Sequence, residues 1–108
     1  MDTIFAQATA PGRAGVAIIR VSGKQAFDIS KNFCKIPTNS KSCLRSLRDK
    51  DDNLIDRALV LKFDRGASFT GEDVIEFHVH GGLATVSKLM SELSSFSNCR
   101  LAEPGEFT

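Results

Sequence analysis

Alternation of apolar and polar side chains is clearest in residues 74–80. Every second position is apolar, and most of the positions between carry a carboxylate or an imidazole. The apolar row is Ile75, Phe77 and Val79, and the other row is Val74, Glu76, His78 and His80. Because successive side chains of a strand point to opposite faces, this pattern predicts a strand with one face in the core and a polar face opposite.

Similar patterns predict five further strands and two helices. The strands are expected from Ile4 towards Pro11 and over Val16–Val21, Leu44–Arg48, Leu54–Phe63 and, briefly, Arg100–Ala102. Apolar residues at three- and four-residue spacing predict helices over Lys24–Phe33 and Leu83–Phe96. This order of elements predicts an α+β fold, in which helices pack on one face of a mixed β-sheet.

The second predicted strand and the helix after it each carry a specific expectation. The near-continuous apolar run of Val16–Val21 predicts a central strand that is covered on both faces. Ser22 is placed to cap the first helix with its hydroxyl.

Length and charge limit the possible functions. A chain of 108 residues forms one domain, which buries roughly two thirds of its unfolded surface. With 14 Lys and Arg against 13 Asp and Glu, the net charge is +1. The basic excess of a protein that grips a phosphate backbone by itself is missing, so any nucleic acid is expected to be held elsewhere.

Cysteine usage and the N-terminus predict a cytoplasmic protein. Cys34, Cys43 and Cys99 are odd in number and lack CxxC spacing, which favours reduced thiols inside the cell. The first residues show neither a signal peptide nor a membrane anchor, so no membrane association is expected.

Arg20 interrupts an otherwise apolar strand. A charged group there is costly unless it is paired or meets an anion. Its stem can pack along the sheet while the guanidinium reaches solvent, or Arg20 is a site residue. Both interpretations remain open from the residues alone.

Glu76, His78 and His80 share one face of their predicted strand. Alternate side chains lie roughly 6.5–7 Å apart, so the three can line one small-molecule pocket, although exposed strands also carry polar rows. The same E-x-H-x-H spacing can supply three zinc ligands, which leaves a metal-dependent hydrolase as an alternative. A single strand rarely supplies a whole ligand set. The sequence contains no P-loop motif and no GxSxG nucleophile elbow.

Three motifs together indicate a family. TAPGRAGVAIIRVSG (Thr9–Gly23), SFTGEDVIEFHVHGG (Ser68–Gly82) and AEPGEFT (Ala102–Thr108) occur in this order. At these separations they resemble the N-terminal domain of the tRNA-modification GTPase family MnmE/TrmE. The motifs bracket nearly the whole chain, whereas residues 35–53 show no match.

The resemblance implies a fold and a ligand. The family domain is similar to the tetrahydrofolate-binding domain of the glycine-cleavage T-protein, forms a homodimer and binds 5-formyltetrahydrofolate or a related tetrahydrofolate. Residues 1–108 would be a single folate-binding and dimerisation domain. By motif position, Arg20 and Glu76 correspond to family folate contacts, with His78, His80 and Gly81 as further candidates. A lysine contact is expected beyond Thr108.

The resemblance also implies a role for the full-length protein. The family acts with an FAD-dependent partner, MnmG or GidA, in the synthesis of 5-carboxymethylaminomethyl-uridine at the wobble position of tRNA. GTP, Mg²⁺ and K⁺ belong to a G domain that follows this one, so no catalytic residue and no metal site are assigned here. Besides the hydrolase using Glu76, His78 and His80, a dimerisation module without ligand remains a second alternative.

Overall fold

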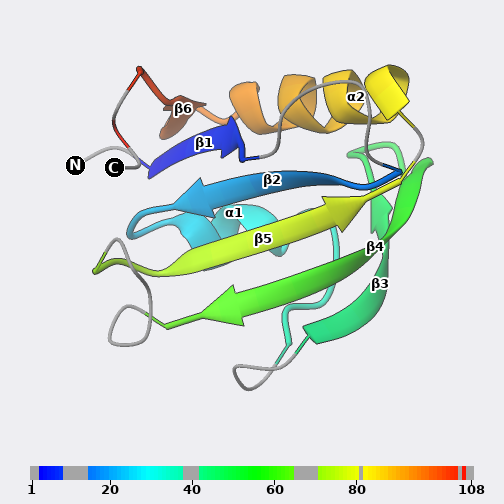
Figure 1. Cartoon of the computed structure of the whole chain (residues 1–108), viewed down its shortest axis with the longest axis horizontal. Coiled ribbons are helices and arrows are strands. Elements are labelled where there is room, and N and C mark those ends of the chain that lie inside the picture. Colours follow the sequence, from blue (N-terminus) through cyan, green and yellow to red (C-terminus); the bar gives the residue numbers. More distant parts are fainter. Residues whose placement is uncertain are drawn as a thin grey trace.

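The computed structural model describes residues 3–8, 15–37, 42–64, 71–80, 82–104 and 106. Within these ranges the chain forms one six-stranded sheet and two helices (Figure 1). The strands are β1 (Thr3–Gln7), β2 (Ala17–Ser22), β3 (Ser42–Arg48), β4 (Leu54–Phe63), β5 (Val74–Val79) and β6 (Cys99–Leu101). The helices are α1 (Ala26–Ser30) and α2 (Gly82–Ser94). The predicted α+β fold is confirmed.

The strands lie in the order β3-β4-β5-β2-β1-β6. The pairs β3–β4, β4–β5, β5–β2 and β2–β1 are antiparallel, and β1–β6 is parallel, so the sheet is mixed. Strands β2 and β5 therefore run side by side at the centre of the sheet. Along the chain, 51 residues lie between the last residue of β2, Ser22, and the first residue of β5, Val74. Their register places Arg20 directly opposite Glu76.

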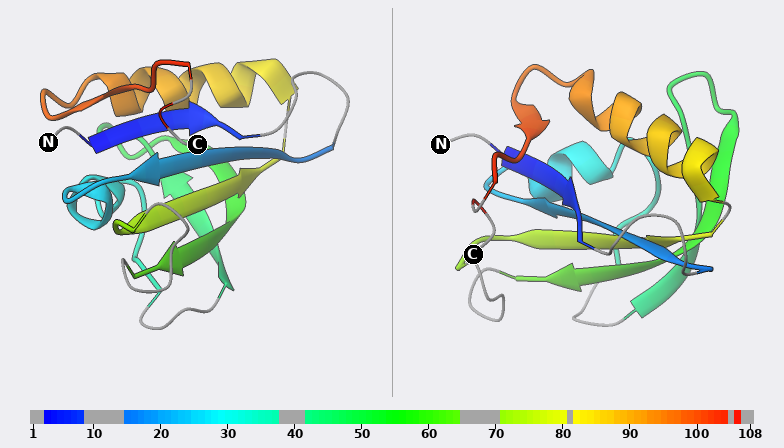
Figure 2. Two further views of the ribbon diagram at one scale, coloured as in Figure 1. Left: turned by 60° about the vertical axis from the view of Figure 1, so that its left-hand side comes forward. Right: turned by 45° about the horizontal axis from the view of Figure 1, so that its top comes forward.

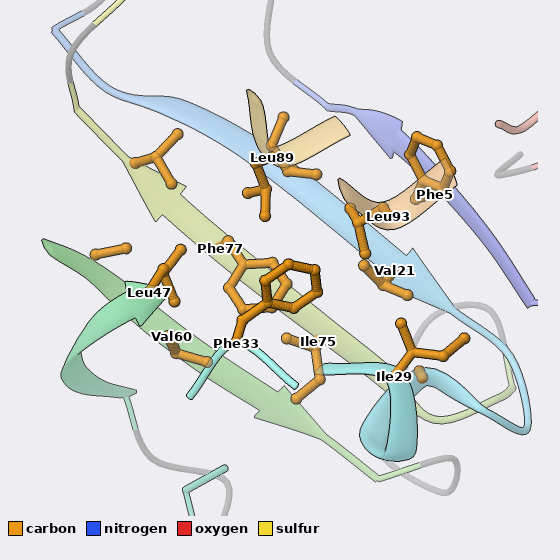
Figure 3. Close-up of a cluster of buried hydrophobic side chains, with 14 of the residues drawn as sticks. Phe5, Val21, Ile29, Phe33, Leu47, Val60, Ile75, Phe77, Leu89 and Leu93 are labelled. Atoms are coloured by element: carbon orange, nitrogen blue, oxygen red, sulfur yellow. The ribbon is translucent and has the colours of Figure 1, made fainter. Parts of the chain in front are cut away.

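Both helices pack on the same face of the sheet, which we call the helix face (Figure 2). The core there combines side chains of β2 and β5 with the buried side of α2 and with Phe33 (Figure 3). Ile75, Phe77 and Val79 are fully buried in it, as the alternation predicts. The Phe33 ring meets the rings of Phe77 and Phe96 edge to face, each at 6.1 Å between centroids. Such aromatic contacts add to the burial of apolar area.

The first helix differs from its prediction. It contains only Ala26–Ser30, and Ser22 is the last residue of β2 rather than the cap. Before the helix begins, Gly23 and Thr3 approach each other closely. A Cβ on Gly23 would lie 2.7 Å from the Thr3 Cα atom, and the Thr3 hydroxyl accepts a hydrogen bond from the Gln25 N–H at 3.0 Å. Thr3 thus binds a backbone N–H near the start of α1, as was expected of Ser22.

The prediction of a central strand is confirmed for β2, whereas its cover on both faces is only partial in the part of the chain that the structure describes. On the face opposite the helices, which we call the far face, Ser22 is buried, but Ile18 and Arg20 are only partly buried. The two rows of β4 divide in the same way. Ala58 and Val60 lie in the core, whereas the larger row of Leu59, Leu61 and Phe63 lies on the far face and keeps some exposure. The far face is therefore apolar in part.

The remaining boundaries follow the predictions closely. Strand β4 has the predicted limits, and α2 and β6 are each displaced by one or two residues. Pro11, towards which the first strand was expected to run, lies outside the described residues. Neither α1 nor α2 has the length and hydropathy that a membrane-spanning helix requires.

Candidate ligand site on the far face of the sheet

Arg20 and Glu76 form an ion pair at the centre of the far face. The two residues are cross-strand partners of β2 and β5, so their side chains leave the sheet on the same side. Arg20 Nε donates to Glu76 Oε2 at 2.8 Å, and Arg20 Nη2 lies 2.7 Å from the same oxygen. The side chains are 22% and 10% exposed. A partly buried pair of this kind has strong, short, charge-assisted hydrogen bonds.

His78 reaches the same carboxylate from the other side. Its Nε2 atom lies 3.1 Å from Glu76 Oε1, and its side chain is 22% exposed. His78 lies two residues further along β5, so the alternation of the strand places both side chains on the far face. Each oxygen of Glu76 therefore has a side-chain partner. Of the residues that sequence reasoning singled out, the structure brings together Arg20, Glu76 and His78.

His80 points elsewhere. Strand β5 ends at Val79, and the backbone N–H of His80 donates to Asp56 Oδ2 at 2.6 Å. The His80 Nδ1 atom lies 3.2 Å from the carbonyl oxygen of Arg57, and the ring is 56% exposed. His80 is thus held at the start of β4 instead of beside Glu76. Gly81 lies outside the described residues.

This arrangement does not assemble the ligands that the metal-dependent alternative requires. Glu76 Oε1 and His78 Nε2 are occupied by each other at hydrogen-bond distance, and His80 is directed to the Arg57 carbonyl. Throughout the described ranges, no group of three or more His, Cys, Asp and Glu side chains is placed to hold a metal ion. A zinc hydrolase would need such a set.

Apolar side chains surround the polar cluster. In the row of Arg20 and Glu76, the next cross-strand neighbours are Ala6 on β1 and Leu61 on β4. In the row of His78 they are Ile18 on β2 and Leu59 on β4. A polar cluster within an apolar frame is typical of small-molecule sites, where a few polar groups fix the orientation of the ligand.

Sequence reasoning did not assign a role to the apolar part of the far face. Leu59 is 36% exposed and Leu44, its partner on β3, is 48% exposed. The sequence did contain an indication of this surface. In β4, Leu59 and Leu61 alternate with Ala58 and Val60, so both faces of the strand carry apolar side chains, and only one of these faces can pack against the helices. Two cavities lined by described residues lie apart from this surface, one between α2, β1 and β6 and the other beside Phe33 and Phe96. None of the residues of the polar cluster lines them.

The fold and this cluster define a small α+β domain with a partly buried charged pair at the centre of the sheet face opposite its helices. Comparison with known proteins gives the family. Residues 3–108 match the family model described as "GTP-binding protein TrmE N-terminus", and the chain belongs to this family.

Curated relatives agree with this assignment. The chain is 51% identical, over its whole length, to the tRNA modification GTPase MnmE of Dinoroseobacter shibae and to that of Roseobacter denitrificans. It is 50% identical, over 99% of its length, to the MnmE protein of Caulobacter vibrioides. It covers 25%, 26% and 24% of these three proteins, so it spans about a quarter of the length of the relatives it matches.

Proposed function

We propose that this chain is the 5-formyltetrahydrofolate-binding and dimerisation domain of a tRNA-modification GTPase. Membership of the TrmE N-terminal family supports the class of protein. The observation that carries the ligand proposal is the contact between Arg20 and Glu76, because the two residues that family likeness assigns to folate lie against each other on one face. A likeness to the glycine-cleavage T-protein remains a prediction.

The chemistry of a pterin ring suits this pair. One edge of the ring presents an amino group, a ring N–H and a carbonyl oxygen in sequence. The Glu76 carboxylate can accept from the two donors together, which is a strong and directional arrangement. The planar guanidinium of Arg20 then donates to the carbonyl oxygen, or to a carboxylate of the para-aminobenzoyl glutamate tail. An acceptor group beside a donor group thus matches the ligand at two points.

Calorimetry with 5-formyltetrahydrofolate tests the proposal. Arg20→Met and Glu76→Gln each remove a charged hydrogen bond, which is worth about 1.5–3 kcal/mol, so each should weaken binding by roughly tenfold or more. Arg48→Met removes a similar side chain at the end of the edge strand β3, where its Nη1 donates to the Asp52 carbonyl oxygen, and should leave the affinity unchanged. Equal affinity of all three variants and the wild type would exclude Arg20 and Glu76 from the site.

A lysine contact is expected beyond Thr108, so the same titration is made with a longer form of the protein. If neither form releases or absorbs heat at high ligand concentration, the folate proposal fails. The dimerisation module without ligand would then be the remaining function.

Dimerisation is the second part of the proposal. Exposed leucines on the far face, Leu44 and Leu59, support an apolar contact with a second copy. Leu44→Asn combined with Leu59→Asn should shift the protein towards monomer in sedimentation equilibrium. Leu83→Asn is the control, because Leu83 is 71% exposed and belongs to α2, which covers the helix face and not the far face. A double variant that self-associates like the wild type would contradict a far-face interface.

For the whole protein, we propose the activity that the relatives' name states, tRNA modification by a GTPase. The GTPase centre, with Mg²⁺ and K⁺, would lie in the part of such proteins that this chain does not cover. The domain would offer a one-carbon unit to a flavin-dependent MnmG or GidA partner in the cytoplasm. The net charge of +1 supports a tRNA contact made mainly by other parts of the complex.

A further inference from the structure

The hydrogen bonds of the Glu76 carboxylate are distributed unevenly. An ionised carboxylate offers about four lone-pair positions, two on each oxygen. Both contacts from Arg20 end on Oε2, whereas Oε1 has a single contact, to His78 Nε2. Among the residues that the structure describes, one position on Oε1 is left without a partner.

This distribution gives His78 a function that differs from that of Arg20. The carboxylate turns about its Cγ–Cδ bond, and the contacts from Arg20 restrain this torsion through Oε2 alone. A donor on the other oxygen restrains the same torsion through Oε1, and it still does so if Arg20 turns an N–H away from Oε2. We propose that His78 is a positioning residue, which holds the plane of the Glu76 carboxylate through an Nε2–H donor. The inference rests on the proposed folate function, because the orientation of Glu76 matters for a planar ligand.

The same count predicts an exchange of partners when the ligand binds. Two parallel ligand donors need one lone pair on each oxygen, and only Oε1 has a position to offer among the described contacts. A ligand donor on Oε2 therefore competes with Arg20, which can turn one of the two N–H groups that it directs to Oε2 and donate it to the ligand instead. His78 does not have to move. The ligand thus replaces part of the Arg20–Glu76 pair, while His78 retains the geometry of the acceptor.

The surroundings of His78 favour this role. Its cross-strand neighbours are Ile18 and Leu59, whose side chains are apolar. Within the described part of the chain, Glu76 is the polar side chain that meets the ring at hydrogen-bond distance. A hydrogen bond in such a frame is stronger than one in water and confines the ring more closely.

Two substitutions at position 78 separate a positioning role from a packing role. His78→Gln keeps an N–H donor at a similar distance from the backbone, whereas His78→Leu keeps apolar volume and removes the donor. In calorimetry with 5-formyltetrahydrofolate, we expect His78→Leu to bind about tenfold more weakly or worse. We expect His78→Gln to stay within about threefold of the wild type, because its donor rescues the contact. Equal affinity of wild type and His78→Leu, or an equal loss in both variants, would overturn the proposal.

Two controls keep the result interpretable. His80→Leu removes the neighbouring imidazole, which contacts the Arg57 carbonyl and not Glu76. A loss in His80→Leu as large as in His78→Leu would contradict a specific role for His78. Denaturant unfolding of each variant shows whether it is folded at the temperature of the titration.

A measurement on the unmodified, ligand-free protein does not depend on any variant at position 78. Nitrogen-15 NMR of the imidazole rings reports which nitrogen carries the proton. We expect the neutral His78 ring to be protonated at Nε2 and its signals to move in Glu76→Gln, whereas those of His80 stay in place. Protonation of neutral His78 at Nδ1 alone would overturn the inference.

Failure of the inference and failure of the proposed function give different results. If the ligand does not bind, or binds equally without Arg20 and Glu76, the folate proposal fails. If binding requires Arg20 and Glu76 but not the donor at position 78, only the role of His78 fails.

Discussion

The two faces of the central strands β2 and β5 have opposite characters. On the helix face, Ile19 and Phe77 face each other across the strand pair and are fully buried. One residue along each strand, Arg20 and Glu76 face each other on the far face as a charged pair. Because successive side chains of a strand point to opposite faces, the row of core side chains and the row that carries the charged pair lie on different faces of the sheet. Substitutions in the core row should therefore have the larger effect on stability, and substitutions of the charged pair the larger effect on ligand binding.

A second comparison concerns two carboxylates with little exposure. The Asp49 side chain is 4% exposed, its Oδ1 atom accepts from the backbone N–H groups of Asp51 and Asn53, each at 2.9 Å, and only its Oδ2 atom has a side-chain partner among the described residues, the half-exposed Lys88 at 3.3 Å. The Glu76 side chain is 10% exposed, and its partners are the side chains of Arg20 and His78. Backbone donors within four residues cannot leave without opening the turn, whereas side-chain donors can exchange with a ligand. Asp49 is thus a structural group and Glu76 a candidate binding group.

Truncation of Phe77 should have the largest effect on stability. Phe77→Ala removes a fully buried ring that packs on Phe33, and a change of this type costs about 3–5 kcal/mol. Urea unfolding followed by circular dichroism measures the loss. Phe77→Leu retains most of the volume and should lose clearly less than Phe77→Ala. A loss below about 1 kcal/mol in Phe77→Ala would show that the helix face is not the main core.

The charged pair of the far face should show a smaller and strongly coupled effect. Arg20→Met or Glu76→Leu alone leaves a partly buried charge without its main partner, and each should destabilise the protein by about 1–3 kcal/mol. The double variant removes both charges, so its loss should be smaller than the sum of the two single losses by about 1 kcal/mol or more. The measurement is a double-mutant cycle of urea unfolding.

A cycle between the two faces calibrates this result. Arg20→Met combined with Leu93→Ala joins the far face to the helix face, where the two side chains lie on opposite sides of the sheet. These losses should add within about 0.5 kcal/mol. Additive losses in the Arg20 and Glu76 cycle itself would mean that the pair contributes little, and the comparison between the two faces would lose its main support.

Much of the difference between the helix face and the far face could be predicted from the sequence. Alternation in residues 74–80 identified the buried row of β5 and placed Glu76 and His78 in the row opposite. Arg20 was recognised because a charge in an apolar strand requires a partner. Local patterns suffice for these statements, since the side-chain period depends only on the backbone of one strand. Family membership came from the three motifs and not from the patterns.

The remainder depends on contacts between distant segments. Neither strand sequence contains the register that places Arg20 opposite Glu76, because register follows from the packing of the whole sheet. Near the start of the first helix, Gly23 approaches Thr3 of β1 and Gln25 donates its backbone N–H to the Thr3 hydroxyl, and these are contacts between two separate segments. His80 departed from the expected cluster because β5 ends one residue earlier and Asp56 of β4 binds its N–H. Such interactions were not visible in any single stretch of sequence.

Acid titration tests the structural role of Asp49. Hydrogen bonds from the Asn53 N–H above all, with a further contribution from Lys88, hold the pKa of Asp49 below its ordinary value of 3.8. A carboxyl whose pKa is lowered by folding stabilises the protein above the unfolded pKa, and this contribution is lost as the pH falls through the folded pKa. Asp49→Asn should therefore unfold at a lower temperature than the wild type near neutral pH, and the difference should begin to narrow below about pH 4 and close once the pH is below the folded pKa.

Asp51→Asn is the matched control for this titration. Asp51 lies in the same turn, but its side chain is exposed and the bond that it makes to Asp49 uses its backbone N–H. Its melting temperature should follow that of the wild type at every pH. A difference between wild type and Asp49→Asn that persists at low pH would show that the charge of Asp49 is not what stabilises the turn. A loss of folate affinity in Asp49→Asn, in protein that remains folded, would show that the helix side and the far face are coupled after all.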